Sequence, residues 1–143
     1  KHLNAINNLA NLKNDLDLIE EAKNLYNKAL EINDNLFQPH YNLASLYQAS
    51  GDFDKSVYHY KKVLKINPKF TKADRNISMM IEYSPENEHF VEMKNKLKDE
   101  NLNNFEKLEL HFAIGKAFDD FKDYKNSFSN ISSANSIKKK ITK

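Results

Sequence analysis

The chain has 143 residues, with 22 Lys and Arg against 20 Asp and Glu, a net charge of +2, 2 Gly and no Cys. The length suffices for one domain with a core, and the near-neutral charge argues against a protein that coats nucleic acid. The absence of Cys excludes disulfides, thiolate nucleophiles and Cys-ligated metals, and two Gly exclude a Gly-rich phosphate loop. The sequence also lacks an apolar run of about 18 residues, so we expect no membrane span and a cytoplasmic location.

Apolar residues recur at helical spacing along almost the whole chain, and no stretch alternates with the period of two that a half-buried strand shows. The stripes are, in chain order, Leu9, Leu12 and Leu16; Ala22, Leu25, Ala29 and Ile32; Tyr41, Leu43, Leu46 and Tyr47; and Val57, Tyr60, Val63, Leu64 and Ile66. The pattern predicts an all-α protein of about eight helices, each of roughly 11–18 residues, with boundaries near residues 16, 36, 50, 70, 84 and 100.

Capping and breaking residues fall between these stripes. Asp52 is a plausible N-cap, and Asn67-Pro68 is expected to end a helix because the residue before proline avoids the helical region. Pro85 is expected just inside the start of another helix, where its missing N–H is harmless. Asn103 and Glu106 have the spacing of a capping box, which predicts a further helix start.

The segment Tyr26–Asn33 reappears as Tyr60–Asn67, at an offset of 34 residues. This period, with large, small, aromatic and proline residues at fixed places, is the signature of the tetratricopeptide helix–turn–helix unit. The second period matches this signature at His40, Leu43, Ala44, Tyr47, Ser56, Tyr60 and Pro68. The sequence therefore resembles the tetratricopeptide repeat family, and the resemblance implies helix hairpins stacked into a right-handed α-solenoid with a concave groove.

We expect a single array over residues 1–143, with repeats at about 3–36, 37–70, 71–107 and 108–141. The third repeat is degenerate, because it keeps the first-helix residues Ile77 and Ile81 but is three residues longer than one period and has Phe90 where a small residue should stand. We interpret 86–98 as a displaced second helix with Phe90, Met93 and Leu97 on its buried face.

Small residues stand where the two helices of a hairpin are expected to approach each other. They are Ala10 and Ala22, Ala44 and Ser56, and Gly115 and Ser127. Aromatic residues such as Tyr26 and Tyr60 are expected to fill the space between hairpins.

The block from Leu110 to Phe121 resembles the last repeat of bacterial tetratricopeptide–sulfotransferase proteins. That resemblance implies a sulfotransferase domain that binds phosphoadenosine phosphosulfate through a phosphate loop. Since this chain has no such loop and begins at Lys1 rather than Met, we expect it to be the non-catalytic repeat segment of a longer protein.

No group of residues in the sequence has the pattern of a catalytic or metal site. The His residues lack the helical pairing with a carboxylate that a zinc site shows, and adjacent acids such as Asp119 and Asp120 point to different helix faces. His40 and His111 occupy the same place in their repeats, which indicates packing. We therefore expect neither an enzyme nor a metal or cofactor site in this chain, and the basic end, Lys138–Lys140, is better explained as a solvated helix end or linker than as a nucleic-acid site.

The groove of the implied solenoid is the best candidate for function, because the first helix of each hairpin lines it. Those places carry amides and other polar groups in the first two repeats and cations in the third: Asn4, Asn7, Asn11 and Asn14; Gln38, Tyr41, Asn42 and Ser45; Lys72 and Arg75. The first four share one helix face. Amides donate and accept hydrogen bonds, so they could hold an extended peptide, and Lys72 with Arg75 would favour an acidic segment.

Asn11, Asn42 and Lys72 also match three of the five anchors with which some members of the family clamp the carboxylate tail of a chaperone. Asn7 and Asn76 replace the other two, so chaperone-tail binding is not expected. The alternative interpretation is that the Asn-rich face is a solvated surface whose many Asn residues reflect the codon composition of an AT-rich genome.

Two functions remain open at the level of sequence. The first is a scaffold that holds a protein or peptide partner in its groove, with no role for nucleic acid or a membrane. The second is an accessory segment that presents substrate to a sulfotransferase domain outside this chain. The sequence does not indicate an oligomeric state.

Overall fold

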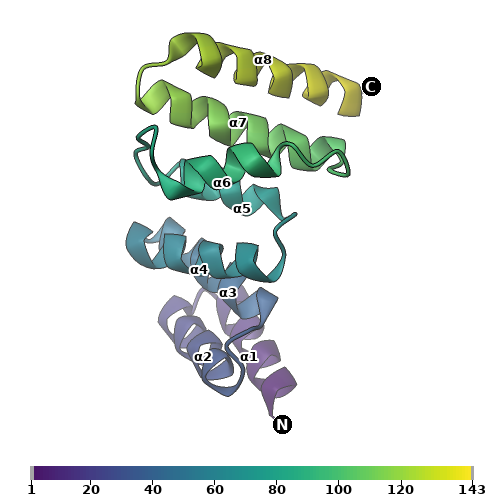
Figure 1. The fold of residues 1–143 in the computed structure, drawn as a ribbon. Coiled ribbons are helices and arrows are strands. Elements are labelled where there is room, and N and C mark those ends of the chain that lie inside the picture. Colours follow the sequence, from purple (N-terminus) through teal and green to yellow (C-terminus); the bar gives the residue numbers. More distant parts are fainter. Residues whose placement is uncertain (1, 143) are drawn as a thin grey trace. The chain divides into compact units, whose positions relative to one another are not determined.

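The computed structural model describes residues 2–142 and contains eight helices in that range (Figure 1). They are α1 Leu3–Asp15, α2 Ile19–Ile32, α3 Phe37–Ala49, α4 Phe53–Ile66, α5 Thr71–Ser78, α6 Glu88–Lys96, α7 Asn104–Asp120 and α8 Tyr124–Ile141. Residues 2–142 include no strand, which confirms the all-α prediction. None of the helices in this range combines the length and apolar character that crossing a bilayer requires.

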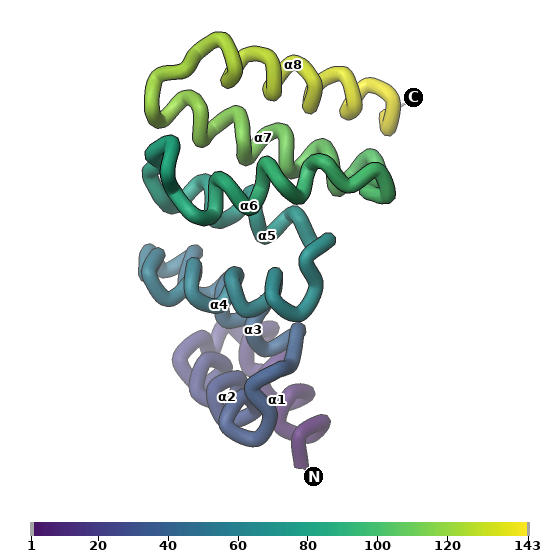
Figure 2. The backbone as a smooth tube through the Cα atoms, viewed as in Figure 1, coloured from purple at the N-terminus to yellow at the C-terminus, as the bar shows by residue number. Residues whose placement is uncertain are grey.

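The chain divides into two compact units, one that ends at Asn67 and holds α1–α4, and one that begins at Pro68 and holds α5–α8. The helix pairs α1–α2, α3–α4 and α7–α8 pack closely as hairpins, and the backbone can be followed through them in Figure 2. In the first unit α2 also packs on α3, and in the second unit α7 contacts both α5 and α6. The single continuous array over both units stays a prediction.

Three hairpins close at the small residues that the sequence indicated. Ala10 and Ala22 are fully buried in one core cluster of the first unit. The Ser56 hydroxyl donates a hydrogen bond to the Ala44 carbonyl at 2.7 Å, and the Ser127 hydroxyl donates to the Gly115 carbonyl at 2.8 Å. A Cβ at Gly115 would lie 2.7 Å from Ile131 Cδ1, so a larger residue would have to push that side chain aside.

The turns of the same three hairpins share one backbone conformation. Asp17, Gly51 and Lys122 have φ values of 63°, 83° and 66°. In each turn the following N–H donates to the carbonyl five residues earlier: Leu18 to Lys13 at 2.8 Å, Asp52 to Tyr47 at 2.9 Å and Asp123 to Phe118 at 2.9 Å. This is the Schellman arrangement, which needs a left-handed residue after the first helix.

The third hairpin cannot make this turn. The residue 34 places after Gly51 is Pro85, whose ring holds φ near −65° and so excludes the left-handed region. Helix α5 ends at Ser78 after 8 residues, and α6 has 9 residues, so the predicted minimum of about 11 residues is wrong for both.

The helix start predicted at Pro85 is also wrong, as is the extension of the first helix to Ile81. Pro85 lies in a turn, and α6 begins only at Glu88. Its cap is Asn87, whose side-chain oxygen accepts from the Phe90 N–H at 3.1 Å. The boundary near residue 84 is therefore replaced by a non-helical segment, 79–87.

The other predicted helix ends agree with the structure. Asn103 and Glu106 form a reciprocal capping box, with N···O distances of 2.8 and 2.9 Å. Helix α4 ends at Ile66, directly before Asn67-Pro68. Asp52 occupies the N-cap of α4, but its carboxylate makes no capping hydrogen bond and instead lies 3.7 Å from Lys55 Nζ.

Helix α6 buries the face that the sequence predicted. Phe90 and Met93 are buried, and Leu97 is partly buried against the same cluster. The Phe90 ring meets Phe118 and Phe121 edge to face, with centroids 5.1 and 5.3 Å apart. A large residue at this place therefore makes an aromatic core, which replaces the close crossing of the other hairpins.

A buried polar network joins α5, α6 and the segment between them. The Asp74 carboxylate, 1% exposed, accepts from His89 Nε2 at 2.8 Å and from Lys96 Nζ at 2.7 Å. Since Nε2 donates, Nδ1 of a neutral His89 accepts from the Tyr83 hydroxyl at 2.7 Å. Burial, with the charges of Asp74 and Asp120, raises the pKa of Tyr83 far above its usual value.

The left-handed turns predict opposite effects of two glycine changes. Gly51→Ala should lower the free energy of unfolding by about 1–2 kcal/mol, because no atom crowds its Cβ and only the backbone conformation is penalised. Lys122→Gly should raise it by up to about 1 kcal/mol, because it relieves the same strain. Urea denaturation of the purified chain measures both.

The matched control is Lys125→Gly, in the first turn of α8, where glycine should lower stability by about 0.5–1 kcal/mol. Equal destabilisation by Lys122→Gly and Lys125→Gly would contradict the role given to the turn.

Candidate functional site

The four amides predicted on the first helix lie along α1 in the first unit. Asn4 and Asn11 are exposed, and Asn7 and Asn14 are partly buried. Their spacing keeps them on one side of the helix. Within the described chain the Asn4 and Asn14 side chains make no hydrogen bond, so both remain available to a partner.

Asn11 connects three helices of the first unit. Its Oδ1 accepts from the Tyr26 hydroxyl on α2 at 2.6 Å and from Asn42 Nδ2 on α3 at 3.5 Å. Tyr26 is 1% exposed, and burial raises its pKa. Asn11 is therefore held in place by the protein. The sequence pattern gave its position on the helix but not this structural role.

Asn7 lies one helical turn before Asn11 and has an unmet hydrogen-bonding capacity. Its Oδ1 is enclosed and, among residues 2–142, has no hydrogen-bond partner. An enclosed polar atom without a partner costs about 1–3 kcal/mol of stability. Among the predicted site residues, Asn7 is therefore the one whose side-chain oxygen is enclosed without a partner in residues 2–142.

The α3 residues of the predicted site surround an ordered aromatic group. The Tyr41 ring stacks on Phe37 at 6.1 Å between centroids and meets Tyr60 edge to face at 6.3 Å. The Tyr60 hydroxyl donates to Gln48 Oε1 at 3.0 Å and lies 3.4 Å from Ser45 Oγ. Tyr60 thus contacts polar side chains on α3, the first helix of its hairpin, as Tyr26 contacts Asn11 on α1. The 34-residue offset between the two tyrosines was the sequence signal for this similarity.

Gln38, the remaining α3 residue of the predicted set, is exposed, while Tyr41, Asn42 and Ser45 are partly buried. Phe37, the stacking partner of Tyr41, was not among the residues that the sequence indicated.

The two predicted cations lie on α5 in the second unit and differ in how they are engaged. Arg75 Nη1 lies 2.8 Å from Glu109 Oε1, and its guanidinium lies 4.3 Å from the centre of the Phe112 ring. Lys72 is exposed and, within the described range, makes no ion pair. The charge of Arg75 is therefore already balanced. Of these two residues, Lys72 is the one that offers an unpaired cation within the described range.

The predicted residues thus form two separate sets, the amide and aromatic set on α1 and α3 and the cation pair on α5. The groove that would join them stays a prediction. Lys72 lines a pocket of about 220 Å³ together with Phe105 and Glu106 in the second unit.

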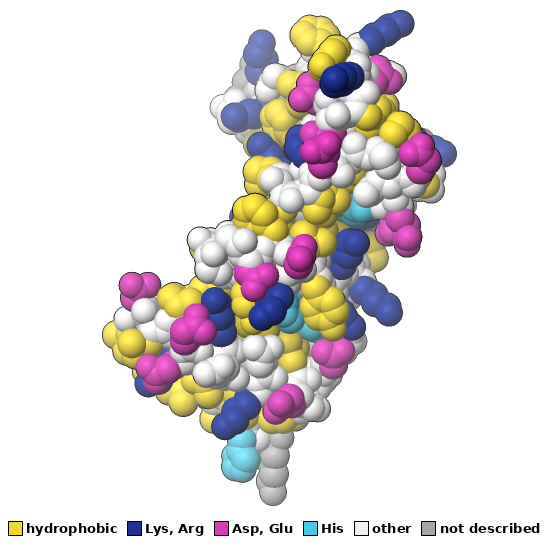
Figure 3. Space-filling view, turned by 90° about the vertical axis from the view of Figure 1, so that its left-hand side faces the viewer, with side chains coloured by type: hydrophobic (Ala, Val, Ile, Leu, Met, Phe, Trp, Pro, Cys, Tyr) yellow, Lys and Arg dark blue, Asp and Glu magenta, His cyan; other side chains and the backbone are white. Residues whose placement is uncertain are grey.

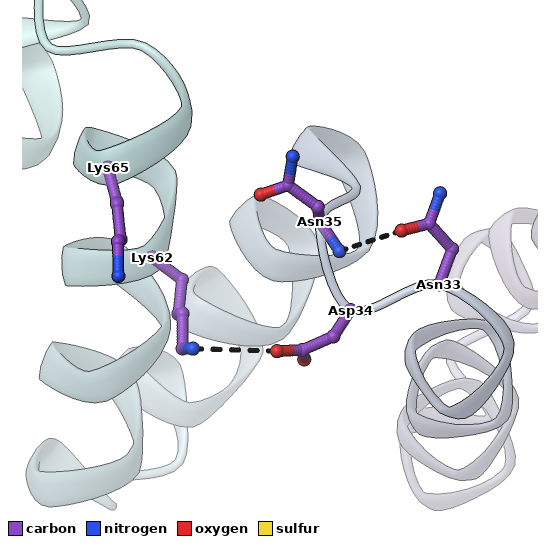
Figure 4. A pocket seen from close by; sticks show the side chains of 5 residues that line it. All are labelled: Asn33, Asp34, Asn35, Lys62 and Lys65. Carbon is purple, nitrogen blue, oxygen red and sulfur yellow. Dashed lines mark hydrogen bonds and ion pairs between the residues drawn. The ribbon is translucent and has the colours of Figure 1, made fainter.

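A pocket of about 340 Å³ in the first unit lies where the α2–α3 loop faces α4 (Figure 4). Lys62 Nζ lies 3.5 Å from Asp34 Oδ2, and the Asn35 N–H donates to Asn33 Oδ1 at 3.0 Å. Lys65 completes the lining. The Lys62–Asp34 ion pair spans this pocket, so these two charges balance each other, and none of the predicted residues lines it.

A histidine pair lies beside a second pocket, of about 440 Å³, in the same unit. His40 Nε2 donates to the Asp34 carbonyl at 2.8 Å, so Nδ1 of a neutral His40 accepts from His59 Nδ1 at 2.9 Å. Two periods and three residues later, His111 and Asn130 repeat the contact at 2.9 Å. The packing role predicted for His40 is confirmed by its complete burial.

No group of three or more His, Asp or Glu side chains in the described part of the chain could hold a metal ion. Burial, and then the charge of His40, lower the pKa of His59 to about 4. His59 therefore stays neutral in the folded chain at pH values where an exposed histidine takes up a proton.

This shift predicts a pH-dependent loss of stability. His59 takes up a proton near pH 6.5 in the unfolded chain and only near pH 4 in the folded chain. Its contribution to the free energy of unfolding is therefore fully present above about pH 6.5 and falls by at most about 3 kcal/mol as the pH drops to about 4. His59→Asn copies Asn130 and should keep the hydrogen bond but remove this part of the loss. Thermal melts of both proteins from pH 7 to pH 4 test it; parallel curves would contradict the assignment.

Comparisons with known proteins agree with the hairpin geometry. Residues 2–69 match the family model of the tetratricopeptide repeat. A crystal structure of MamA shares the fold with a TM-score of 0.73 at 13% identity, over 98% of this chain and 80% of that chain. A further structure, MamA MSR-1 C2, has a TM-score of 0.69 at 14% identity, over 96% and 78% of the two chains.

None of the curated proteins matches the sequence. The family match therefore covers residues 2–69, and the likeness to MamA shows a shared fold over almost the whole chain.

Proposed function

We propose that the chain binds a protein or peptide partner through the polar face of α1 and α3 in its first unit. Tetratricopeptide domains generally act as non-catalytic scaffolds for protein–protein interaction. The observation that carries the proposal is the pair on α1: Asn11 is fixed by Tyr26 and Asn42, and the neighbouring Asn7 has an enclosed oxygen without a partner. Asn11 is fixed by hydrogen bonds, whereas the Asn7 oxygen makes none within residues 2–142.

This face has the chemistry to hold an extended peptide. A peptide backbone offers alternating N–H and C=O groups, and an amide side chain can satisfy either. Asn4 and Asn14 extend the row in both directions along α1. Tyr41, held between Phe37 and Tyr60, would supply an apolar surface for a side chain of the partner.

We assign the acidic preference of the partner site to Lys72. Arg75 is paired with Glu109 and lies over Phe112, so it would have to break an ion pair to bind a carboxylate. Lys72 is exposed, makes no ion pair among residues 2–142, and borders a pocket with an exposed aromatic ring, Phe105. We propose Lys72 as the contact of the second unit for an acidic residue.

A substitution of Asn7 should change binding and stability in opposite directions, so it gives the sharpest test. Asn7→Leu should raise the free energy of unfolding by about 1 kcal/mol, because it removes the unsatisfied oxygen. The same change should weaken binding of a peptide selected from a displayed library about fivefold or more. Calorimetric titration and urea denaturation measure the two effects.

The matched control is Asn8→Leu, at an exposed α1 position outside the row of amides, which should change neither quantity by much. Asn11→Ala should weaken binding and also lower stability by about 1 kcal/mol, because Tyr26 loses its acceptor. Peptides that bind Asn7→Leu as tightly as the unchanged chain would refute the proposed face.

The second candidate function is an accessory segment of a sulfotransferase. It is supported by the block from Leu110 to Phe121, which resembles the last repeat of such proteins and forms most of α7. In that case the coding sequence after Lys143 should encode a strand, a phosphate loop rich in Gly, Ser and Thr, and a helix. A different downstream sequence would eliminate this candidate and leave the binding proposal in place.

A further inference from the structure

Helix α1 carries an apolar stripe that its own unit does not cover. Leu9, Leu12 and Leu16 are 43%, 52% and 60% exposed. Their spacing of three and four residues places them on one face of the helix. Hydrophobic side chains also reach the surface on both units in Figure 3, but only a stripe in helical register presents a continuous face to another helix.

The internal repeat shows what kind of element covers such a face. Leu43 and Leu46 stand 34 residues after Leu9 and Leu12. Leu43 is fully buried and Leu46 partly buried, in one cluster with Tyr26 and Leu30. In the first unit, the second helix of the preceding hairpin therefore covers these positions.

The second unit repeats the arrangement. Ile114 and Ala117 follow Leu9 and Leu12 by 105 residues, which is three periods plus the three extra residues of the third repeat. They are 2% and 0% exposed and share a core with Phe90 of α6. Two independent hairpins thus bury the positions that α1 leaves open.

Helix α8 presents the complementary surface. Tyr124 and Phe128, one helical turn apart, are 62% and 74% exposed. Phe128 stands 105 residues after Lys23. In the first unit Lys23 reaches the next hairpin, with its ammonium 4.9 Å from the centre of the Tyr47 ring. Phe128 therefore occupies the position from which a second helix contacts the hairpin that follows it.

We propose that α8 of one copy of this chain docks on α1 of a second copy, by the same packing that joins α2 to α3. In this contact Phe128 meets Lys13 of the other copy, because Lys13 is the counterpart of Tyr47. Compared with the Lys23–Tyr47 pair, the first helix now supplies the cation and the second helix the ring. Lys13 lies 3.1 Å from Glu21 Oε1 in its own copy, and its ammonium can keep this ion pair while it meets the Phe128 ring. The contact uses neither the amides nor the cations of the proposed peptide site.

The two docking surfaces differ, so the association is head-to-tail and does not close at two copies. Asn135 of α8 replaces the apolar Leu30 of α2, which makes this contact more polar than the internal one. We therefore expect association at protein concentrations on the order of 0.1–1 mM.

Two charge substitutions test the proposal by sedimentation equilibrium of the full chain from about 10 µM to about 1 mM. Leu12→Glu blocks the α1 surface and Phe128→Glu blocks the α8 surface. Each variant alone should remain a monomer. Their equimolar mixture should form a 1:1 dimer and nothing larger, because each supplies the surface that the other lacks, while the unchanged chain should form a continuing series.

The matched control is Ser129→Glu, at an exposed position of α8 whose spacing from Tyr124 and Phe128 places it off their face, and this variant should associate like the unchanged chain. Circular dichroism melts check folding, and Leu12→Gln serves as a second α1 variant. The proposal is overturned if the unchanged chain stays monomeric at 1 mM, if Phe128→Glu alone still dimerises, or if the mixed variants do not associate.

Discussion

The hairpin is closed by one residue that must adopt a positive φ, and the other features of the fold follow from that closure. At Asp17, Gly51 and Lys122 the chain turns through the left-handed region, and the next N–H bonds back to the end of the first helix. The two helices then meet at small side chains, and in two hairpins a serine hydroxyl bonds to the facing backbone carbonyl. This geometry fixes which face of each first helix is packed and which stays polar.

The third hairpin shows what happens when the turn is unavailable. Pro85 stands where the left-handed residue should be, and α5 stops at Ser78, well before the turn. Other interactions hold the hairpin instead. Asp74 binds His89 and Lys96 in a buried network, and Phe90 forms an aromatic core with side chains of α7 and its end. Stability there comes from side-chain contacts rather than from a backbone turn.

Much of the fold could be predicted because it depends on local spacing. The apolar stripes, the 34-residue offset and the Asn103–Glu106 capping box gave the helices, the hairpins and one exact helix start. The end of α5 was missed because helical periodicity continues through Ile81. The contrary signal was present, since counting one period from Gly51 leads to a proline at the position that needs a positive φ.

The helix positions of the candidate residues could be predicted, but their side-chain contacts could not. Helical spacing placed the four amides on one side of α1, but it could not show that Tyr26 holds Asn11 or that Asn7 lacks a partner. Likewise, spacing suggested Arg75, with Lys72, as a contact for an acidic segment, but it could not show the ion pair of Arg75 with Glu109, 34 places later in the chain. Such contacts depend on how helices pack, which composition and spacing leave open.

Amide hydrogen exchange resolved by residue tests the role of the turn most directly. If the left-handed closure holds the hairpins, the N–H groups of Leu18, Asp52 and Asp123 should be strongly protected, because each is bonded to a carbonyl of its own turn. In the segment 79–87, which lacks this turn, the N–H groups of Ile81, Glu82, Ser84 and Glu86 make no hydrogen bond within residues 2–142 and should exchange much faster. Exchange at Leu18, Asp52 and Asp123 as fast as at these four groups would contradict the role of the turn.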